Sequence, residues 1–247
     1  MIPNPIRKVL SSMRAHRVRA LLMGGQACVF YGAAEFSRDM DFAVLAEAAN
    51  LACLRRALDD LQAEVIAVPS FELQYLRRGH AIHFRCRHPH ALRMRVDVMS
   101  KMRGVDAFPR LWKRRTTIEL PDGTHCELLS LPDLVQAKKT QRDKDWPMIR
   151  RLVEAHYFQN IAKPNPAQIR FWLQDLRTPQ LLVEVAQRHT RLCRRLISTR
   201  PLVAYAALGK IKQLEQALLA EESTEREVDR RYWLPLRAEL EKLRHAR

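Results

Sequence analysis

The sequence predicts a mixed α/β core, a sheet flanked by helices, over residues 1–160, followed by an all-helical C-terminal domain over residues 165–247. Three observations lead to this fold class. Short apolar or alternating segments, which are typical of strands, stop after Leu129. From Trp146 onward, apolar residues recur only at helical spacing. Between the two parts lies Ala162-Lys-Pro-Asn-Pro166, whose prolines disfavour a continuous helix.

In the α/β part, a helix is expected over residues 5–16, because its apolar residues fall on one face. A buried strand over 18–23 stops at Gly24-Gly25, a helical turn over 26–31 ends at Gly32, and an alternating strand covers 39–45. The remaining expected elements are a helix over 46–61, strands over 64–68, 81–86 and 94–99, a basic helix over 108–115, and strands over 116–120 and 124–129 joined by the hairpin turn Pro121-Asp122-Gly123.

The helical part begins with Ser130-Leu-Pro-Asp133, which resembles a capping box and predicts a helix to about residue 141. Arginines 188, 191, 194 and 195 recur at helical spacing and are expected on one face. That face is either a solvated surface or half of a two-domain cleft that binds a nucleic-acid backbone. Further helices are expected over 146–157, 169–176, 179–197, 202–219 and 225–245, the last with a kink at Pro235.

Composition restricts the possible partners. The chain has 247 residues, 47% of them apolar, and a formal charge of +16, so nucleotides and nucleic acids are favoured and polycationic small molecules are disfavoured. The five cysteines are scattered and form no Cys-x-x-Cys pair, which indicates reduced thiols in a cytoplasmic protein. No apolar run approaches the roughly 20 residues of a membrane-spanning helix, and no secretory signal is recognisable, so no membrane partner is expected.

The segment from residue 22 to residue 44 carries the most chemistry. Asp39 and Asp41 are two residues apart on an expected strand, so both carboxylates lie on the same face. Two neighbouring carboxylates repel each other and are stable mainly where a cation bridges them, and Mg²⁺ prefers such oxygen ligands. Gly24 and Gly25 would let backbone amides approach the phosphates of a nucleotide, beside the N-terminus of the following helix.

Asp97 would complete a two-metal site. It stands alone in the apolar strand Arg95-Val-Asp-Val-Met99, where an unpaired carboxylate is costly. It therefore either pairs with a nearby arginine or serves the site, as a metal ligand or as the base for an attacking hydroxyl.

Gly24-Gly25, a spacer of thirteen residues, Asp39-x-Asp41 and a later lone Asp97 resemble the polymerase-beta-type nucleotidyltransferase superfamily. More narrowly, the pattern is similar to the small bacterial nucleotidyltransferases of abortive-infection and toxin–antitoxin systems. The resemblance covers about residues 18–158. It implies the nucleotidyltransferase fold, with the three aspartates as catalytic residues and metal ligands.

The same resemblance assigns nucleotide-binding residues. Ser37 occupies the Ser/Thr position of the family's Arg-x-Ser/Thr-x-Asp-x-Asp pattern, whereas Glu35 stands at the Arg position and Arg38 is the residue expected to compensate. Downstream, Lys138 would hold the triphosphate, Arg142 would lie one helical turn away, and Asp145 would support the site. Lys139 is an alternative to Lys138, and Asp145 is alternatively the N-cap of the following helix.

The implied reaction moves a nucleoside monophosphate from an NTP to an acceptor hydroxyl with Mg²⁺ or Mn²⁺ and releases pyrophosphate. The expected acceptor is an RNA or a protein, and a cognate antitoxin is an expected partner. The alternative is a catalytically silent protein of the same fold that binds nucleic acid or protein. The histidines His80, His83, His88 and His90 lack zinc-site spacing and are expected at the surface or in packing roles.

Overall fold

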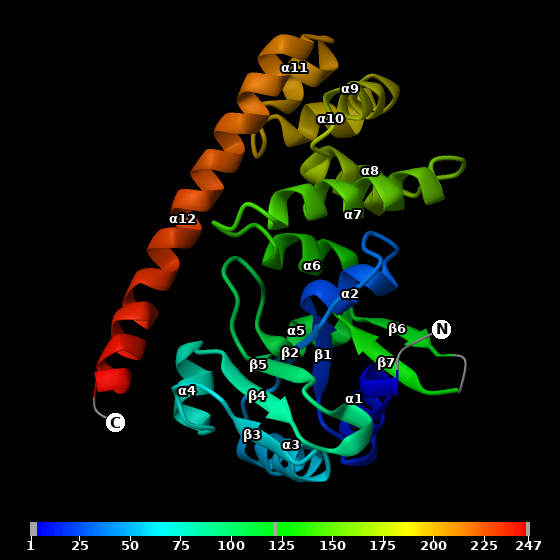
Figure 1. Cartoon of the computed structure of the whole chain (residues 1–247). Coiled ribbons are helices and arrows are strands. Elements are labelled where there is room, and N and C mark those ends of the chain that lie inside the picture. The colour runs from blue at the N-terminus through cyan, green and yellow to red at the C-terminus, as the bar shows by residue number, and fades with distance from the viewer. Residues whose placement is uncertain (1–3, 121–122, 246–247) are drawn as a thin grey trace. The chain divides into compact units, whose positions relative to one another are not determined.

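The computed structural model of this chain describes residues 4–120 and 123–245 (Figure 1). The chain forms two compact units. The first contains the residues up to Ala137 together with those from Trp233 onward, and the second is Lys138–Tyr232. The first unit is mixed α/β and the second is helical, as the sequence predicts.

The first unit is built on a seven-stranded mixed sheet with the order β3-β4-β5-β2-β1-β7-β6. Strand β2 pairs antiparallel with β1 and parallel with β5, and β1 also pairs parallel with β7. The two edges are the antiparallel pairs β3–β4 and β6–β7. The strands are β1 (Ala20–Met23), β2 (Asp39–Val44), β3 (Ala63–Val65), β4 (Ile82–Cys86), β5 (Arg95–Met99), β6 (Thr116–Glu119) and β7 (His125–Leu128).

Alternation along the central strands separates an apolar face of the sheet from a polar one. Met40 and Phe42 of β2 and Val96 and Val98 of β5 are at most 3% exposed, while the residues between them are less buried. The apolar side chains form part of the core of the unit. The helices of this unit are α1 (Asn4–Ala15), α2 (Gly24–Phe30), α3 (Ala48–Asp60), α4 (Leu73–Arg78), the 3₁₀ turn η1 (Pro89–Ala91), α5 (Phe108–Lys113) and α6 (Leu131–Ala137).

All seven predicted strands are present, with ends shifted by a few residues. The predicted turn residues Pro121 and Asp122 lie outside the described residues, but β6 and β7 pair antiparallel as a hairpin requires. The short helix α4 was not predicted, because six residues are too few for a helical period to stand out. The predicted helix to residue 141 ends at Ala137, and the residues before α7 form turns.

The second unit consists of helices packed on one another. Helix α9 packs against α8 and α11, and α10 contacts all three of these helices. The helices are α7 (Asp145–Asn160), α8 (Pro166–Asp175), α9 (Pro179–Arg188), α10 (Thr190–Leu196), α11 (Val203–Ala207) and α12 (Ile211–His245), whose residues from Trp233 onward belong to the first unit. Among the described residues, no helix has both the length and the apolar character needed to cross a membrane.

Two predicted helices have different bounds. The helix expected over 179–197 is interrupted at His189, whose backbone (φ −121°, ψ 50°) leaves the helical region. The helix expected over 202–219 ends at Ala207, and Gly209 (φ +65°) supplies a left-handed turn before α12. Helix α12 then runs without interruption through residues 219–225 and contains Pro235.

The division into units differs from the boundary predicted at residues 160–165. Helices α7 and α8 pack together within the second unit, which begins at Lys138. The prolines of the predicted linker instead form a helix start. Asn165 caps α8 through its side chain, Pro166 lies in the first turn, and Gln168 completes a capping box.

Candidate functional site

Strand register brings the candidate acids together in the first unit. Asp41 of β2 is paired with Asp97 of β5, and Asp39 is paired with Arg95. On its other side, Asp41 is paired with Met23, the residue before Gly24. Neighbouring strands are about 4.8 Å apart, and paired residues share a face. The polar face of the sheet therefore carries Asp39, Asp41 and Asp97 at adjacent positions.

The Gly24-Gly25 turn lies directly against these side chains. A Cβ atom at Gly24 would come 1.8 Å from Asp41 Oδ2, and Gly24 has φ +67°. A Cβ atom at Gly25 would come 2.7 Å from Ser37 Oγ, which donates a hydrogen bond to the backbone oxygen of Asp39 at 3.0 Å. Only glycine fits this arrangement, because any larger residue would displace the carboxylate or the hydroxyl.

Asp97 has partners that the sequence prediction left open. Arg95 Nε donates to Asp97 Oδ1 at 2.9 Å, and His83 Nδ1 lies 2.9 Å from the same oxygen. The pairing with an arginine is thus the alternative that the structure shows. In the part of the chain that the structure describes, both contacts are made to Oδ1 rather than to Oδ2. Asp97 Oδ2 takes part in neither of these two contacts.

The charges around Arg95 connect all three acids. Its hydrogen bond to Asp97 raises the pKa of Arg95, and the nearby carboxylates of Asp39 and Asp41 act in the same direction. Burial of Asp97 acts to raise its pKa, but hydrogen bonds from His83 and Arg95 outweigh this and hold the pKa of Asp97 below its usual value. Arg95 is therefore a positive charge set among three negative ones.

Gln26 is a further polar group at the Gly-Gly turn, and the sequence prediction missed it. It lies in the first turn of α2 and is 3% exposed, and its Oε1 accepts no hydrogen bond within the described residues. Leaving a buried acceptor unsatisfied costs about 1–3 kcal/mol. A donor from water or a bound molecule would satisfy this oxygen.

The donor chemistry fits a divalent cation only in part. Within residues 4–120 and 123–245, no group of three or more His, Cys, Asp or Glu side chains is arranged to hold a metal ion. A preformed three-carboxylate site is therefore not found, and Asp97 is engaged with Arg95. Asp39 and Asp41 place carboxylate oxygens on one face of β2, which suits Mg²⁺ when substrate phosphates and water complete its shell.

The other candidate residues lie in the second unit. Lys138 Nζ donates to Asp145 Oδ1 at 3.2 Å, and Arg142 Nε donates to Asp145 Oδ2 at 2.8 Å. Thr140 Oγ1 also donates to this carboxylate. Burial acts to raise the pKa of Asp145, but the Lys138 charge, the Thr140 hydrogen bond and the Arg142 charge outweigh it and lower the pKa.

This cluster corrects two expectations about local structure. Lys138 and Arg142 are not one turn apart on a helix, because α6 ends at Ala137. Asp145 is the first residue of α7, and Lys144 is the N-cap. Lys138 is 8% exposed and paired with Asp145, whereas the side chain of Arg142 is 58% exposed. Arg142 is thus the more accessible phosphate-binding candidate of the two, and the alternative Lys139 pairs with Asp175 at 2.8 Å.

The remaining candidates are at the surface or in packing contacts. Arg38 and Glu35 are exposed in the segment before β2. The predicted histidine group does not form a zinc site. His80 contacts Glu239 at 2.9 Å, His83 contacts Asp97, and the rings of His88 and His90 contact each other. The five cysteines, all of them within the described residues, are thiols rather than disulfides.

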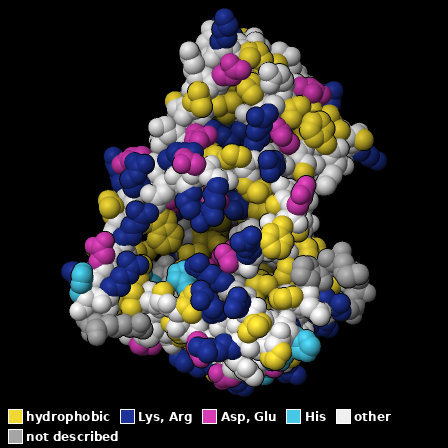
Figure 2. Space-filling view, in the orientation of Figure 1, with side chains coloured by type: hydrophobic (Ala, Val, Ile, Leu, Met, Phe, Trp, Pro, Cys, Tyr) yellow, Lys and Arg dark blue, Asp and Glu magenta, His cyan; other side chains and the backbone are white. Residues whose placement is uncertain are grey.

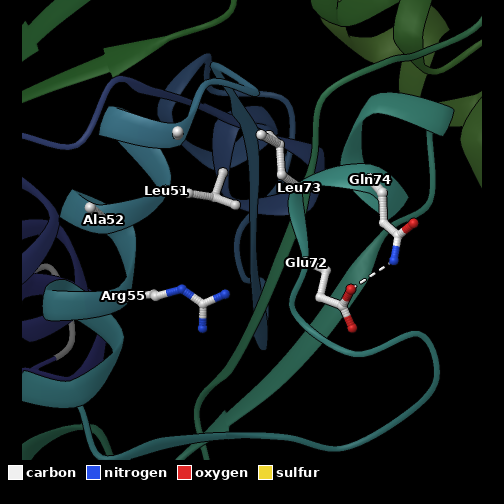
Figure 3. A pocket seen from close by; sticks show the side chains of 7 residues that line it. Leu51, Ala52, Arg55, Glu72, Leu73 and Gln74 are labelled. Atoms are coloured by element: carbon white, nitrogen blue, oxygen red, sulfur yellow. Dashed lines mark hydrogen bonds between the residues drawn. The ribbon is translucent and has the colours of Figure 1, made fainter.

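A shallow pocket of about 480 Å³ lies elsewhere in the first unit, between α3 and the start of α4 (Figure 3). Its side chains include Arg55 and Leu51 from α3 and Glu72 and Gln74, which are joined by a 2.7 Å hydrogen bond. None of the candidate residues lines it. The pocket therefore adds nothing to the proposed chemistry.

Comparison of the chain with models of known protein families and with curated protein sequences gave no match. The functional assignment accordingly rests on the residues and geometry described above.

Proposed function

We propose that the chain is a metal-dependent nucleotidyltransferase of the polymerase-beta type, which transfers a nucleoside monophosphate from an NTP to an acceptor hydroxyl. The observation that carries this proposal is the close approach of Gly24 to Asp41. Gly24 has a positive φ, and no side chain would fit there because Asp41, one of three adjacent acids, lies against it. This close approach supports a ligand site at the turn.

Asp39 and Asp41 are the residues that would hold Mg²⁺ or Mn²⁺. The bound ion would neutralise triphosphate charge and polarise the reacting phosphate. The backbone at Gly24-Gly25 would approach the phosphates, with Ser37 fixing the segment before Asp39. Arg38, in the segment before β2, has an exposed guanidinium group that would bind phosphate oxygens.

Asp97 would be the third carboxylate of the site. Its lowered pKa makes it a weak proton acceptor near neutral pH, which favours a ligand role through Oδ2 over a role as general base. His83 and Arg95 would be positioning residues, because both contact Asp97 Oδ1 and fix the orientation of the carboxylate.

A second function has its own supporting observation. Arg95 offsets part of the negative charge of the three acids without any metal, as a silent binding protein of the same fold would require. Incubation with each labelled NTP, Mg²⁺ or Mn²⁺, total RNA and cell lysate separates the two functions. Asp39→Asn/Asp41→Asn is the test variant, and Asp59→Asn, an exposed acid on α3, is the control.

The transferase predicts label in RNA or protein with the wild type and with Asp59→Asn, and none with the double variant. Label that persists in the double variant would refute the assignment of these acids. An absence of label from every combination, together with no NTP binding, would favour the silent binding protein.

A further inference from the structure

Three arginines of α10 differ from most other arginines of the second unit. Within this unit, most arginines are paired with a carboxylate, as Arg150 is with Glu154 and Arg177 is with Glu221. The described residues provide no ion-pair partner for Arg191, Arg194 or Arg195, which we call the α10 arginines. All three are exposed.

Their spacing places them on one face. Arg194 and Arg195 follow Arg191 by three and four positions within the continuous helix α10, so each is a neighbour of Arg191 on the helix surface. Arg188 ends α9 before the break at His189, so the broad face of four arginines predicted from sequence is reduced to three on α10. Buried Cys193 and Leu196 anchor the helix to the rest of the unit.

The surrounding sequence contains no acid that could neutralise this face locally. Figure 2 shows Lys and Arg side chains over much of the face in view, with Asp and Glu side chains scattered among them. Residues 185–214 differ, because they include no Asp or Glu and seven basic residues, Arg188, Arg191, Arg194, Arg195, Arg200, Lys210 and Lys212. Like charges one helical turn apart destabilise a helix, so such a cluster is best stabilised by an external anion.

The neighbouring helix adds an aromatic group. Helix α11 contacts α10 and carries Tyr205, which is 40% exposed. Aromatic side chains beside a basic surface stack on the bases of single-stranded nucleic acid. Arginine, with its planar set of donors, binds phosphate oxygens in pairs and is better suited to this than lysine.

We propose that the α10 arginines are a docking surface for the phosphate backbone of a single RNA strand, with Tyr205 stacking on one of its bases. Unpaired bases are needed for stacking, and the single strands available in a cell are mainly RNA. The inference goes beyond the transfer reaction, because RNA binding at α10 does not require the acids of the first unit.

The test measures the anisotropy of a fluorescent, unstructured 20-nucleotide RNA with the full-length protein, without NTP, at several salt concentrations. The test variant is Arg191→Gln/Arg194→Gln/Arg195→Gln. The matched control is Arg150→Gln/Arg230→Gln/Arg231→Gln, which removes three exposed arginines of the same unit that are already paired with Glu154 or Glu227. Thermal unfolding of both variants checks that they are folded.

The α10 variant should bind RNA at least roughly tenfold more weakly at low salt, and its log–log salt slope should fall by about 2, since each contact to a single strand contributes about 0.7. The control should change little, and Tyr205→Leu should weaken binding about fivefold or more. Equal losses in both triple variants, or no loss in either, would overturn the proposal.

Two competitors identify the partner. Polyglutamate that displaces the RNA as well as unlabelled RNA does would overturn the proposal in favour of an acidic protein. Duplex DNA that binds as tightly would overturn the assignment to a single strand. Asp39→Asn/Asp41→Asn should bind RNA like the wild type, so the failure of the transferase proposal and the failure of this one give different results.

Discussion

Charged side chains are arranged differently in the two units of this protein. In the first unit, strand register concentrates three carboxylates near the guanidinium of Arg95. In the second unit, buried charges are matched, as Asp145 is by Lys138 and Arg200 by Glu221. Ion pairing is the usual way to keep charged groups in a fold. Local concentrations of like charge stand out against this background and identify candidate functional surfaces, namely the acids of the sheet and the α10 arginines.

The largest effect is expected from Gly24→Ala, which tests whether the acids depend on the glycine turn. The new Cβ atom would meet Asp41 Oδ2 at 1.8 Å, so the carboxylate must move. Displacement of a reacting group by about 1 Å can reduce a rate by about 10²-fold, and a reduction of at least that size in NMP transfer is expected. Initial rates of label transfer measure it.

Gly32→Ala is the control for Gly24→Ala. Gly32 also has a positive φ, +74°, but a Cβ atom there would meet nothing within 4 Å. Both variants should lose about 1–2 kcal/mol of stability from backbone strain. A matching loss of transfer in Gly32→Ala would show that strain, and not the contact with Asp41, is responsible.

Asp145→Ala tests the matched charges of the second unit. The substitution leaves Lys138, whose side chain is 10% exposed, without its carboxylate. Removing one partner of a buried ion pair destabilises a protein by about 3–5 kcal/mol. Denaturant unfolding should show a loss near the lower end, because the side chain of Arg142 is partly exposed. A loss below about 1 kcal/mol would contradict the structural role assigned to Asp145.

The pH dependence of stability should be weaker in Asp145→Asn. The pKa of Asp145 is lower in the folded protein than the value of about 3.9 in an unfolded chain. Its ionised form therefore stabilises the fold above the unfolded pKa, and this contribution is lost as the pH falls through the folded pKa. Unfolding between about pH 5 and pH 2 should depend less on pH in Asp145→Asn than in the wild type or in Glu215→Gln, an exposed acid of the same unit.

The smallest effect is expected where α12 joins the first unit. Glu239 accepts hydrogen bonds from Arg78 and from buried His80. Glu239→Gln should lower stability by about 1 kcal/mol or less, because the contact is partly exposed. Hydrogen exchange should become faster in residues 233–245 and remain unchanged in residues 211–232. Faster exchange along the whole helix, or an equal effect of the exposed variant Glu241→Gln, would show that this contact does not fix the helix end.

The sequence predicted the sheet well because period-two alternation is visible even in short strands. The same alternation placed Asp39 and Asp41 on one face, and the structure confirms this placement. Sequence could not show that His83 is paired across β4 and β5 with Asp97, because cross-strand register depends on the whole sheet. The contact between Arg95 and Asp97 could have been predicted, because residues two positions apart on a strand lie on the same face.

The helical part was harder to predict. No proline or glycine separates residues 179–197 after Pro179, so the break at His189 left no local signal. Gly209 is a helix-breaking residue that the prediction overlooked. The predicted helix over 202–219 therefore joined α11 to the start of α12. No glycine or proline marks the end of α6 at Ala137 either. The position of Lys138 in a turn, paired with Asp145, was therefore not predicted.

The proposed transfer reaction requires Asp39 and Asp41 to hold a metal ion together with a nucleotide. Electron paramagnetic resonance of Mn²⁺, with and without a nonhydrolysable NTP analogue, tests it most directly. The two carboxylates alone should bind Mn²⁺ weakly, and the analogue should strengthen binding in the wild type but not in Asp39→Asn/Asp41→Asn. Mn²⁺ binding that is independent of the analogue, or equal in the wild type and the double variant, would contradict the account.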